Sequence, residues 1–168
     1  MNAQCFSDLI LYRTWYFRLS ITILATCLSL MAVAQPEEAS RRRNFNTENG
    51  IALREFDPVS YFKARPLKGN SKFHHTHKGI TYYFANQENV DEFKKSPDKY
   101  EPAYGGWCAY TVALNGDRVK INPATYKIID GRLYLFHNFN SDNRLIKWNK
   151  EEKRLKAVAN KNWVAKMH

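Results

Sequence analysis

Residues Lys78–Phe84 read Lys-Gly-Ile-Thr-Tyr-Tyr-Phe and give the strongest indication of the fold in this chain. Residues 80–84 are β-branched or aromatic, which is typical of a strand. Gly79 can adopt a positive φ, so Lys78 and Gly79 predict the turn of a hairpin whose first strand covers residues 72–77. We therefore expect an antiparallel β-hairpin here.

A short helix is expected directly after this hairpin. Asn86 is a favourable N-cap for a helix over residues 87–95, and Pro97 is expected to end it. Glycine and proline between residues 101 and 107 predict turns, and residues 108–114 fit a helix or a strand equally well.

A second hairpin is indicated near the C-terminal third of the chain. Asp130-Gly131 separates strand-like residues 126–129 from residues 132–136. From Ser141 onward the apolar spacing is helical, with a break near Asn149. Together these patterns predict a small single α+β domain with β-hairpins, a short helix after the second strand, and C-terminal helices.

The N-terminus has the pattern of a secretory signal. Arg13 and Arg18 precede the charge-free run Leu19–Ala34, which ends in Ala32-Val33-Ala34. This run is shorter than the roughly 20 apolar residues that a transmembrane helix needs. We predict a cleavable signal peptide over residues 1–34 and a periplasmic or extracellular protein; an uncleaved membrane anchor is the alternative.

The remainder divides into two parts by composition. Residues 35–49 are polar and rich in arginine, which predicts a flexible leader, and residues 50–168 form the expected domain. The formal net charge is +10, but the basic residues are spread along the chain. A solvated positive surface is favoured over a nucleic-acid site, and the sequence indicates no particular protein partner.

Cysteine usage excludes an internal disulfide after signal cleavage. Cys5 and Cys27 lie in the predicted signal peptide, which leaves Cys108 alone. Three interpretations of Cys108 remain open: a small buried hydrophobe, a metal ligand, or a reactive thiol that needs a neighbouring base.

Histidines are the other candidate ligands. On a strand His75 and His77 share one face and His74 takes the other. Such a pair can bind Cu(II) or Zn, but needs a further ligand. The predicted metal set is Cys108, His75 and His77, with His137 in reserve; the alternative is an exposed, unliganded strand face.

An aromatic set could form a cofactor or ligand pocket. We select Tyr61, Tyr104 and Trp107 for this role, with simple core packing as the alternative. Asp57, before Pro58, fits either a catalytic acid or a turn-fixing carboxylate. Because no paired carboxylates, ordered Ser-His-Asp set or phosphate loop is present, a non-enzymatic role is favoured.

Several segments between Ile51 and Trp163 together resemble one known family. They are Asp57-Pro58-Val59-Ser60-Tyr61-Phe62, Lys78–Phe84, Asn86, Asn89, Phe93, Pro97, Lys99-Tyr100, Tyr104-Gly105-Gly106-Trp107-Cys108-Ala109 and Gly131-Arg132-Leu133-Tyr134-Leu135. In this combination the chain resembles the YHS domain family, and its C-terminal tryptophans resemble the longer exported subgroup.

The resemblance does not extend to the cysteines through which some members of the family could bind metal. In YHS modules attached to metal-transporting ATPases, three cysteines are plausible soft-metal ligands. The corresponding positions here are Ser60, Ala85 and Asn89, so this chain lacks all three thiols.

The functional expectation is therefore an exported YHS-like binding domain that holds a transition-metal ion, Cu or Zn, through Cys108 and histidines. Two alternatives stay open: a thiol-dependent redox protein or enzyme built on Cys108, and an interaction module without a small-ligand site.

Overall fold

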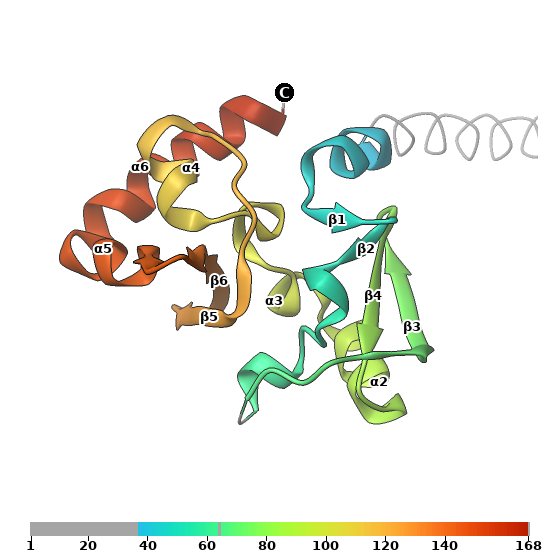
Figure 1. Ribbon diagram of the computed structural model, residues 1–168. Coiled ribbons are helices and arrows are strands. Elements are labelled where there is room, and N and C mark those ends of the chain that lie inside the picture. Colours follow the sequence, from blue (N-terminus) through green and yellow to red (C-terminus); the bar gives the residue numbers. More distant parts are fainter. Residues whose placement is uncertain (1–36, 64, 168) are drawn as a thin grey trace, which may run out of the picture. The chain divides into compact units, whose positions relative to one another are not determined.

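Strand β4 (Ile80–Phe84) is central to the larger sheet in the computed structural model, which describes residues 37–63 and 65–167. It pairs antiparallel with β3 (Asn70–His77), in the register His77 to Ile80 and His75 to Tyr82. Lys78 and Gly79 have φ of 44° and 79°, as a tight hairpin turn requires. The predicted hairpin is confirmed (Figure 1).

Two short strands complete this sheet. β1 (Thr47–Glu48) pairs antiparallel with β2 (Ile51–Ala52), which runs parallel to β4, so the order is β1-β2-β4-β3. Strand β3 is therefore an edge strand.

The folded unit begins well before residue 50. The prediction of a flexible leader over residues 35–49 is therefore wrong for its described part. Residues 38–44 are helical and belong to the same compact unit as the rest of the domain. Phe45 is buried, and the Trp107 Nε1–H donates to the carbonyl of Asn44 at 2.6 Å. The polar composition of this segment did not indicate that it is packed. One of its arginines, Arg41, is buried because it pairs with Glu101.

Helix α2 (Gln87–Lys95) begins where the sequence indicates. The Asn86 side chain accepts from the Asn89 N–H at 2.9 Å, and Val90 and Phe93 are buried. Pro97 ends this helix but also starts a further turn, α3 (Pro97–Tyr100), because proline is well tolerated at a first helical position.

The second hairpin consists of β5 (Asn122–Ile129) and β6 (Arg132–Phe136), joined at Asp130-Gly131 as predicted. Strand β6 is buried on both faces. Leu133 and Leu135 contribute to a core with the larger sheet and α2, whereas Tyr134 and Phe136 contribute to a core with the C-terminal helices. The period-2 alternation of one strand thus serves two apolar clusters.

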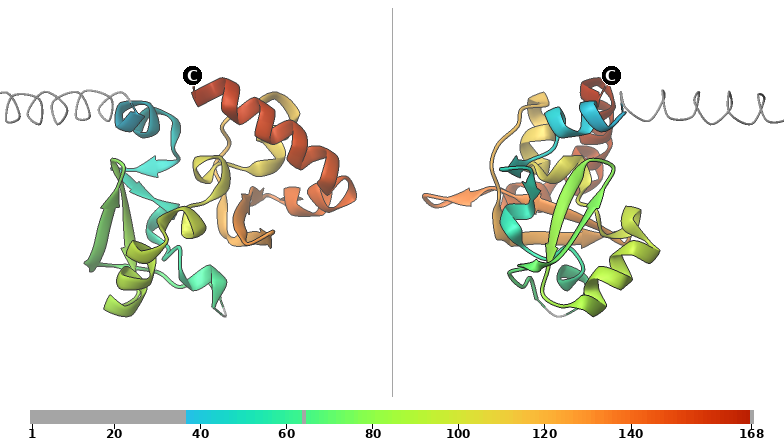
Figure 2. Two further views of the ribbon diagram at one scale, coloured as in Figure 1. Left: turned by 180° about the vertical axis from the view of Figure 1, so that it is seen from behind. Right: turned by 90° about the vertical axis from the view of Figure 1, so that its right-hand side faces the viewer.

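The C-terminal part is helical, with one correction. Residues Asn138–Phe139 (β7) and Asp142–Asn143 (β8) form a small hairpin, so the helical pattern starts at Arg144 and not at Ser141. This hairpin projects from the domain in the right-hand view of Figure 2. Helices α5 (Arg144–Lys150) and α6 (Glu152–Met167) follow, separated close to the predicted break.

Three single turns and one helix link these elements. The segment that sequence patterns left open forms helix α4 (Ala109–Asn115), which packs against α6. The turns are η1 (Leu53–Glu55), η2 (Ser60–Phe62) and η3 (Ala103–Gly106). The predicted small α+β fold with hairpins and C-terminal helices is confirmed.

Asp57 connects three segments through a fully buried carboxylate. Its Oδ1 accepts the Val59 N–H at 2.8 Å, and its Oδ2 accepts the Ala85 N–H at 2.9 Å. Oδ2 also accepts the Asn89 side-chain amide at 2.5 Å. The turn-fixing interpretation of Asp57 is therefore the correct one, with a reach that extends to β4 and α2.

The predicted signal peptide, residues 1–34, lies outside the described residues. Within the described ranges, no helix combines the length and apolarity that crossing a bilayer requires.

Replacing the Asp57 carboxylate should strongly destabilise the domain. Asp57→Ala leaves buried N–H donors without an acceptor, so the free energy of unfolding should fall by about 3 kcal/mol or more. Urea denaturation measures this change. Asp91→Ala, at an exposed position on α2, is the control and should change the same quantity by less than about 0.5 kcal/mol. Equal effects of the two substitutions would contradict the assignment.

Candidate functional site

The histidines of β3 lie as their spacing indicates. His75 and His77 share the face that packs on α2, and each ring meets Phe93 edge-on, with centroids 6.1 and 6.2 Å away. His74 is exposed on the other face, and its Nδ1 lies 2.9 Å from the Ser71 carbonyl oxygen. Burial, followed by the charges of Lys94 and the neighbouring histidines, lowers the pKa of His75.

His77 differs from the other two because its Nε2 atom is buried and has no hydrogen-bond partner. Buried polar atoms in proteins are nearly always satisfied, so an orphaned ring nitrogen calls for an explanation. The Asp98 Oδ1 atom lies 4.0 Å away, too far for a hydrogen bond.

A carboxylate from α3 and one from its C-cap converge on this nitrogen. Ligand atoms of His77, Asp98 and Glu101 all lie within 4.8 Å of one another. Asp98 and Glu101 are three residues apart on the turn that Pro97 starts, so both project toward the end of β3. In the described ranges this is the one group of three or more histidine, cysteine or acidic side chains with metal-ligand spacing.

Glu101 is held in place by two donors. Its Oε1 accepts from Arg41 Nη2 at 2.5 Å and from the Tyr82 hydroxyl at 2.6 Å, and all three side chains are largely buried. The guanidinium compensates the buried negative charge. Both side-chain bonds go to Oε1, which leaves Oε2 for a ligand.

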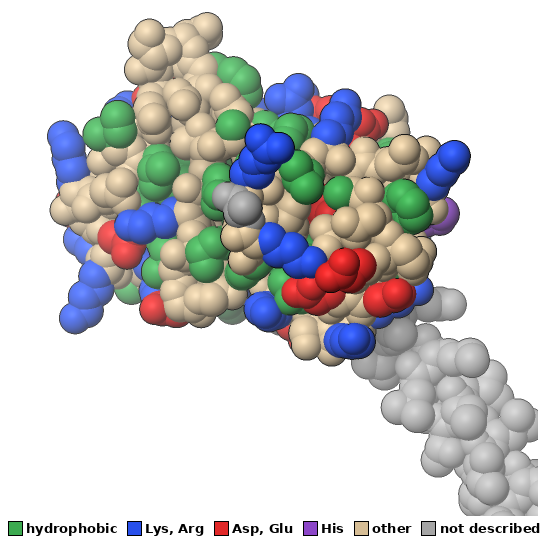
Figure 3. Space-filling view, turned by 90° about the horizontal axis from the view of Figure 1, so that it is seen from below, with side chains coloured by type: hydrophobic (Ala, Val, Ile, Leu, Met, Phe, Trp, Pro, Cys, Tyr) green, Lys and Arg blue, Asp and Glu red, His purple; other side chains and the backbone are tan. Residues whose placement is uncertain are grey.

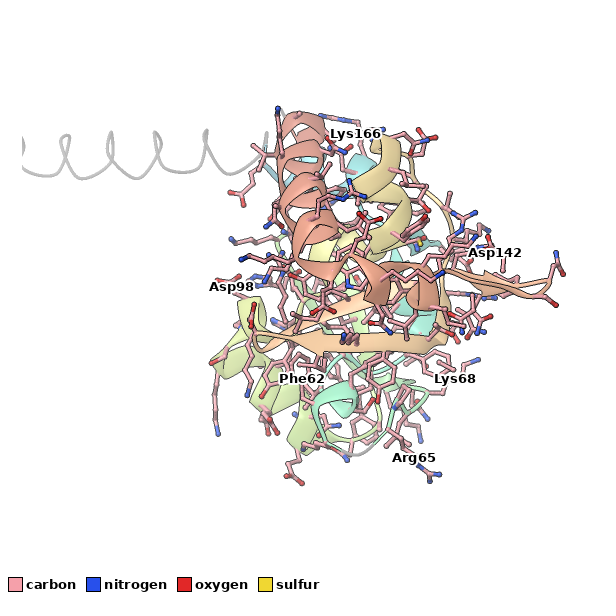
Figure 4. All side chains as sticks on the ribbon, turned by 90° about the vertical axis from the view of Figure 1, so that its left-hand side faces the viewer. Phe62, Arg65, Lys68, Asp98, Asp142 and Lys166 are labelled. Atoms are coloured by element: carbon pink, nitrogen blue, oxygen red, sulfur yellow. The ribbon has the colours of Figure 1, made fainter. Side chains whose placement is uncertain are left out.

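Asp98 supplies an exposed counterpart to this fixed carboxylate, since its side chain is 88% exposed. Figure 4 shows Asp98 at the edge of the molecule formed by α3, on the opposite side of that view from Asp142. The site therefore opens to solvent on its Asp98 side.

Cys108 does not belong to this group. It is fully buried at the N-cap of α4, where its N–H donates to the Val119 carbonyl. The predicted set of Cys108, His75, His77 and His137 is not brought together, since no three of these described residues lie at ligand spacing. Only His77 keeps a place in the candidate site.

The surroundings of Cys108 are nevertheless polar on one side. Arg144 hydrogen-bonds the Thr111 hydroxyl at 2.5 Å and the Asp142 carboxylate at 2.9 Å. Burial lowers the pKa of Arg144, but bonds to Asp142 and the neighbouring Cys108 raise it overall. Hydrogen bonds from Lys147 and Arg144 lower the pKa of Asp142 to about 2. Because Cys108 has no exposed surface, this arrangement does not present a thiol to solvent.

His137 does not belong to the candidate site and has other contacts. Its Nδ1 lies 3.1 Å from the Lys120 carbonyl oxygen, and its ring packs edge-on against Phe139.

The three aromatic residues chosen for a cofactor pocket have structural partners instead. Tyr61 is buried and its hydroxyl donates to the Pro123 carbonyl. Tyr104 is buried and its hydroxyl donates to Asn160, and Trp107 donates to Asn44. Their polar groups are therefore satisfied by the fold, as core and anchoring residues require.

The positions at which the YHS resemblance places thiols do lie together. Ser60, Ala85 and Asn89 all bond to Asp57: the Ser60 hydroxyl donates to its carbonyl, and the other two donate to its carboxylate. Lys63 extends the network by donating to Asn89 Oδ1 at 2.7 Å. A hydrogen-bonded carboxylate thus lies among these three residues.

Three residues of the site escaped sequence reasoning: Arg41, Asp98 and Glu101. The available signal was the Pro-Asp-x-x-Glu spacing of residues 97–101, which places two carboxylates on one side of a turn. Nothing in the sequence connected that turn to His77, which is distant along the chain.

The molecular surface shows no uniform basic patch on the face seen in Figure 3, where Lys and Arg side chains are interspersed with acidic and apolar ones. No family model, characterised protein or solved structure shows significant similarity to this chain. The YHS assignment therefore stays a prediction.

The Tyr82–Glu101 contact predicts that the domain loses stability at alkaline pH. Burial, together with Glu101, raises the pKa of Tyr82 well above its ordinary value of 10.0. The folded state then binds a proton that the unfolded chain loses, so stability is complete below pH 10 and falls as the pH rises further. Tyr82→Phe should flatten this slope by up to about 1.4 kcal/mol per pH unit.

Denaturant unfolding between pH 9 and 11 measures the slope. Tyr83→Phe, on the opposite face of β4, is the matched control and should leave it unchanged. An identical slope in Tyr82→Phe and the wild type would refute the coupling.

Proposed function

We propose that this protein is a small exported domain that binds a divalent transition-metal ion through His77, Asp98 and Glu101. The observation that carries the proposal is the buried, unpartnered His77 Nε2 atom facing two carboxylates. A coordinated ion would satisfy this nitrogen, and none of the surrounding described side chains does so.

The donor set suits zinc and its neighbours. One imidazole nitrogen and two carboxylate oxygens are ligands that Zn accepts, and three protein ligands leave a coordination position open. In tetrahedral zinc sites ligand atoms are about 3.4 Å apart. The Asp98 Oδ1 atom lies 4.0 Å from His77 Nε2, so it has to move closer by a fraction of an ångström. Its high exposure permits that movement.

Hydrogen bonds to the proposed ligand Glu101 support the same interpretation. Ligating carboxylates are normally oriented by hydrogen bonds from outside the coordination sphere. Arg41 and Tyr82 provide these for Glu101 before any ion arrives. The Asp57 network, by contrast, has its carboxylate occupied by four N–H donors and holds no spare ligand.

Calorimetric titration with Zn²⁺ tests the proposal. We expect one ion per chain, and His77→Ala should weaken binding by at least about 10-fold because one of three protein ligands is lost. His74→Ala removes a histidine from the opposite face of the same strand, so it should bind zinc like the wild type. Cys108→Ser should also keep the affinity, even where it lowers stability.

Absence of measurable zinc binding would overturn the proposal. Equal losses in His74→Ala and His77→Ala would do so as well, because they would point to general surface binding.

Export is the second part of the proposal and rests on the pattern of residues 1–34. Expression of the full gene with its signal should yield a protein whose first residue is Gln35. Mass spectrometry of the intact purified protein measures this. A chain that keeps residues 1–34 and remains membrane-bound would support the anchor alternative.

A further inference from the structure

A pocket of about 450 Å³ lies next to the proposed ion site. This volume is in the range of small-molecule sites. Asp98 and Glu101 contribute to its wall, and the other walls come from the helical segment 38–44, the turn between β5 and β6, and α6. The ion site and the pocket therefore share two carboxylates.

One wall of the pocket is aromatic and closely packed. Phe45 and Trp163 meet edge-on, with ring centroids 6.2 Å apart. Gly105 allows their approach, because a Cβ atom at this position would lie 2.9 Å from Trp163 Cη2. Its φ of +59° also favours glycine. This wall offers an apolar surface to a ligand.

The charged groups of the pocket are not equally available. Arg41 is occupied by Glu101 and by the Lys78 carbonyl, and Asp130 pairs with Lys156 at 2.5 Å. Arg132 is exposed and forms no ion pair with any described carboxylate. It is the cation in this pocket that a ligand can engage.

The balance of charge depends on the ion. The lining has two arginines and three acidic residues, a formal net charge of −1. A divalent cation on Asp98 and Glu101 changes this to +1. Because Lys156 also pairs with Asp130, the empty pocket is close to neutral and the loaded one is positive, so the ion gives the pocket its attraction for an anionic ligand.

We infer that the ion-loaded pocket binds a small organic carboxylate with an apolar body. Arg132 meets the carboxylate, and Trp163 with Phe45 contacts the body. Arginine is the side chain best suited to carboxylates, because its planar fork donates two parallel hydrogen bonds. This inference rests on the proposed function, since the ion supplies the positive charge.

Benzoate is a suitable probe because it combines one carboxylate with an apolar ring and chelates zinc poorly. Zinc affinity is measured first by calorimetry, and benzoate is then titrated into zinc-loaded and zinc-free protein. We expect benzoate to bind the zinc-loaded protein at least about 10-fold more tightly. Arg132→Gln should weaken benzoate binding by about 10-fold and leave zinc affinity unchanged, as expected for loss of one charged contact.

Arg65→Gln is the matched control. Arg65 is also an exposed arginine, but Figure 4 shows it far from Asp98, so its replacement should alter neither titration.

The outcomes separate the two proposals. Zinc binding without benzoate binding, or benzoate binding that Arg132→Gln does not weaken, overturns the carboxylate site and leaves the metal site standing. Equal benzoate affinity with and without zinc overturns the argument that the ion attracts the carboxylate. Failure to bind zinc overturns the proposed function, and this inference with it.

Discussion

The buried carboxylate of Asp57 is the constraint on which the arrangement of the larger sheet and α2 depends. A carboxylate without exposed surface is costly unless hydrogen bonds replace the water that it has lost. Here the donors come from its own turn, from the residue after β4 and from α2. Asp57 is distant in sequence from Ala85 and Asn89, so one side chain ties its own turn to the end of β4 and to α2. The packing of Val90 and Phe93 on the sheet follows from that geometry.

A second constraint comes from β6, whose two faces serve two apolar clusters. Leu133 and Leu135 face one cluster, and Tyr134 and Phe136 face the other. A shift of one residue would exchange these sets, so the β5–β6 register is strongly specified. Helix α3 packs against β6, and this contact places Asp98 and Glu101 beside Arg132 at the pocket. The candidate site thus lies where β3, α3 and the segment before β1 come together.

Two of the three proposed ligands are held by the fold, and the third is exposed to solvent. Glu101 is fixed by Arg41 and Tyr82, and His77 is fixed by its strand and by Phe93. Asp98 is almost fully exposed. This arrangement suits an ion that enters from solvent and is enclosed by one moving carboxylate. It also explains why residues 38–44 belong to the domain, because Arg41 balances the charge that the site places in the interior.

Sequence patterns alone were enough to predict the local structure: both hairpins, the Asn86-capped helix, the break between α5 and α6, and the shared face of His75 and His77. These features depend on turn chemistry, capping and the alternation of a strand, which act over a few residues. The candidate site, in contrast, depends on tertiary packing. This packing buried Cys108, did not gather it with the histidines into a set of three ligands, and placed Asp98 and Glu101 next to His77. It also drew the polar segment around Arg41 into the fold. Spacing along the chain cannot specify contacts between distant segments, because these depend on how the sheet, α3 and the segment before β1 pack together.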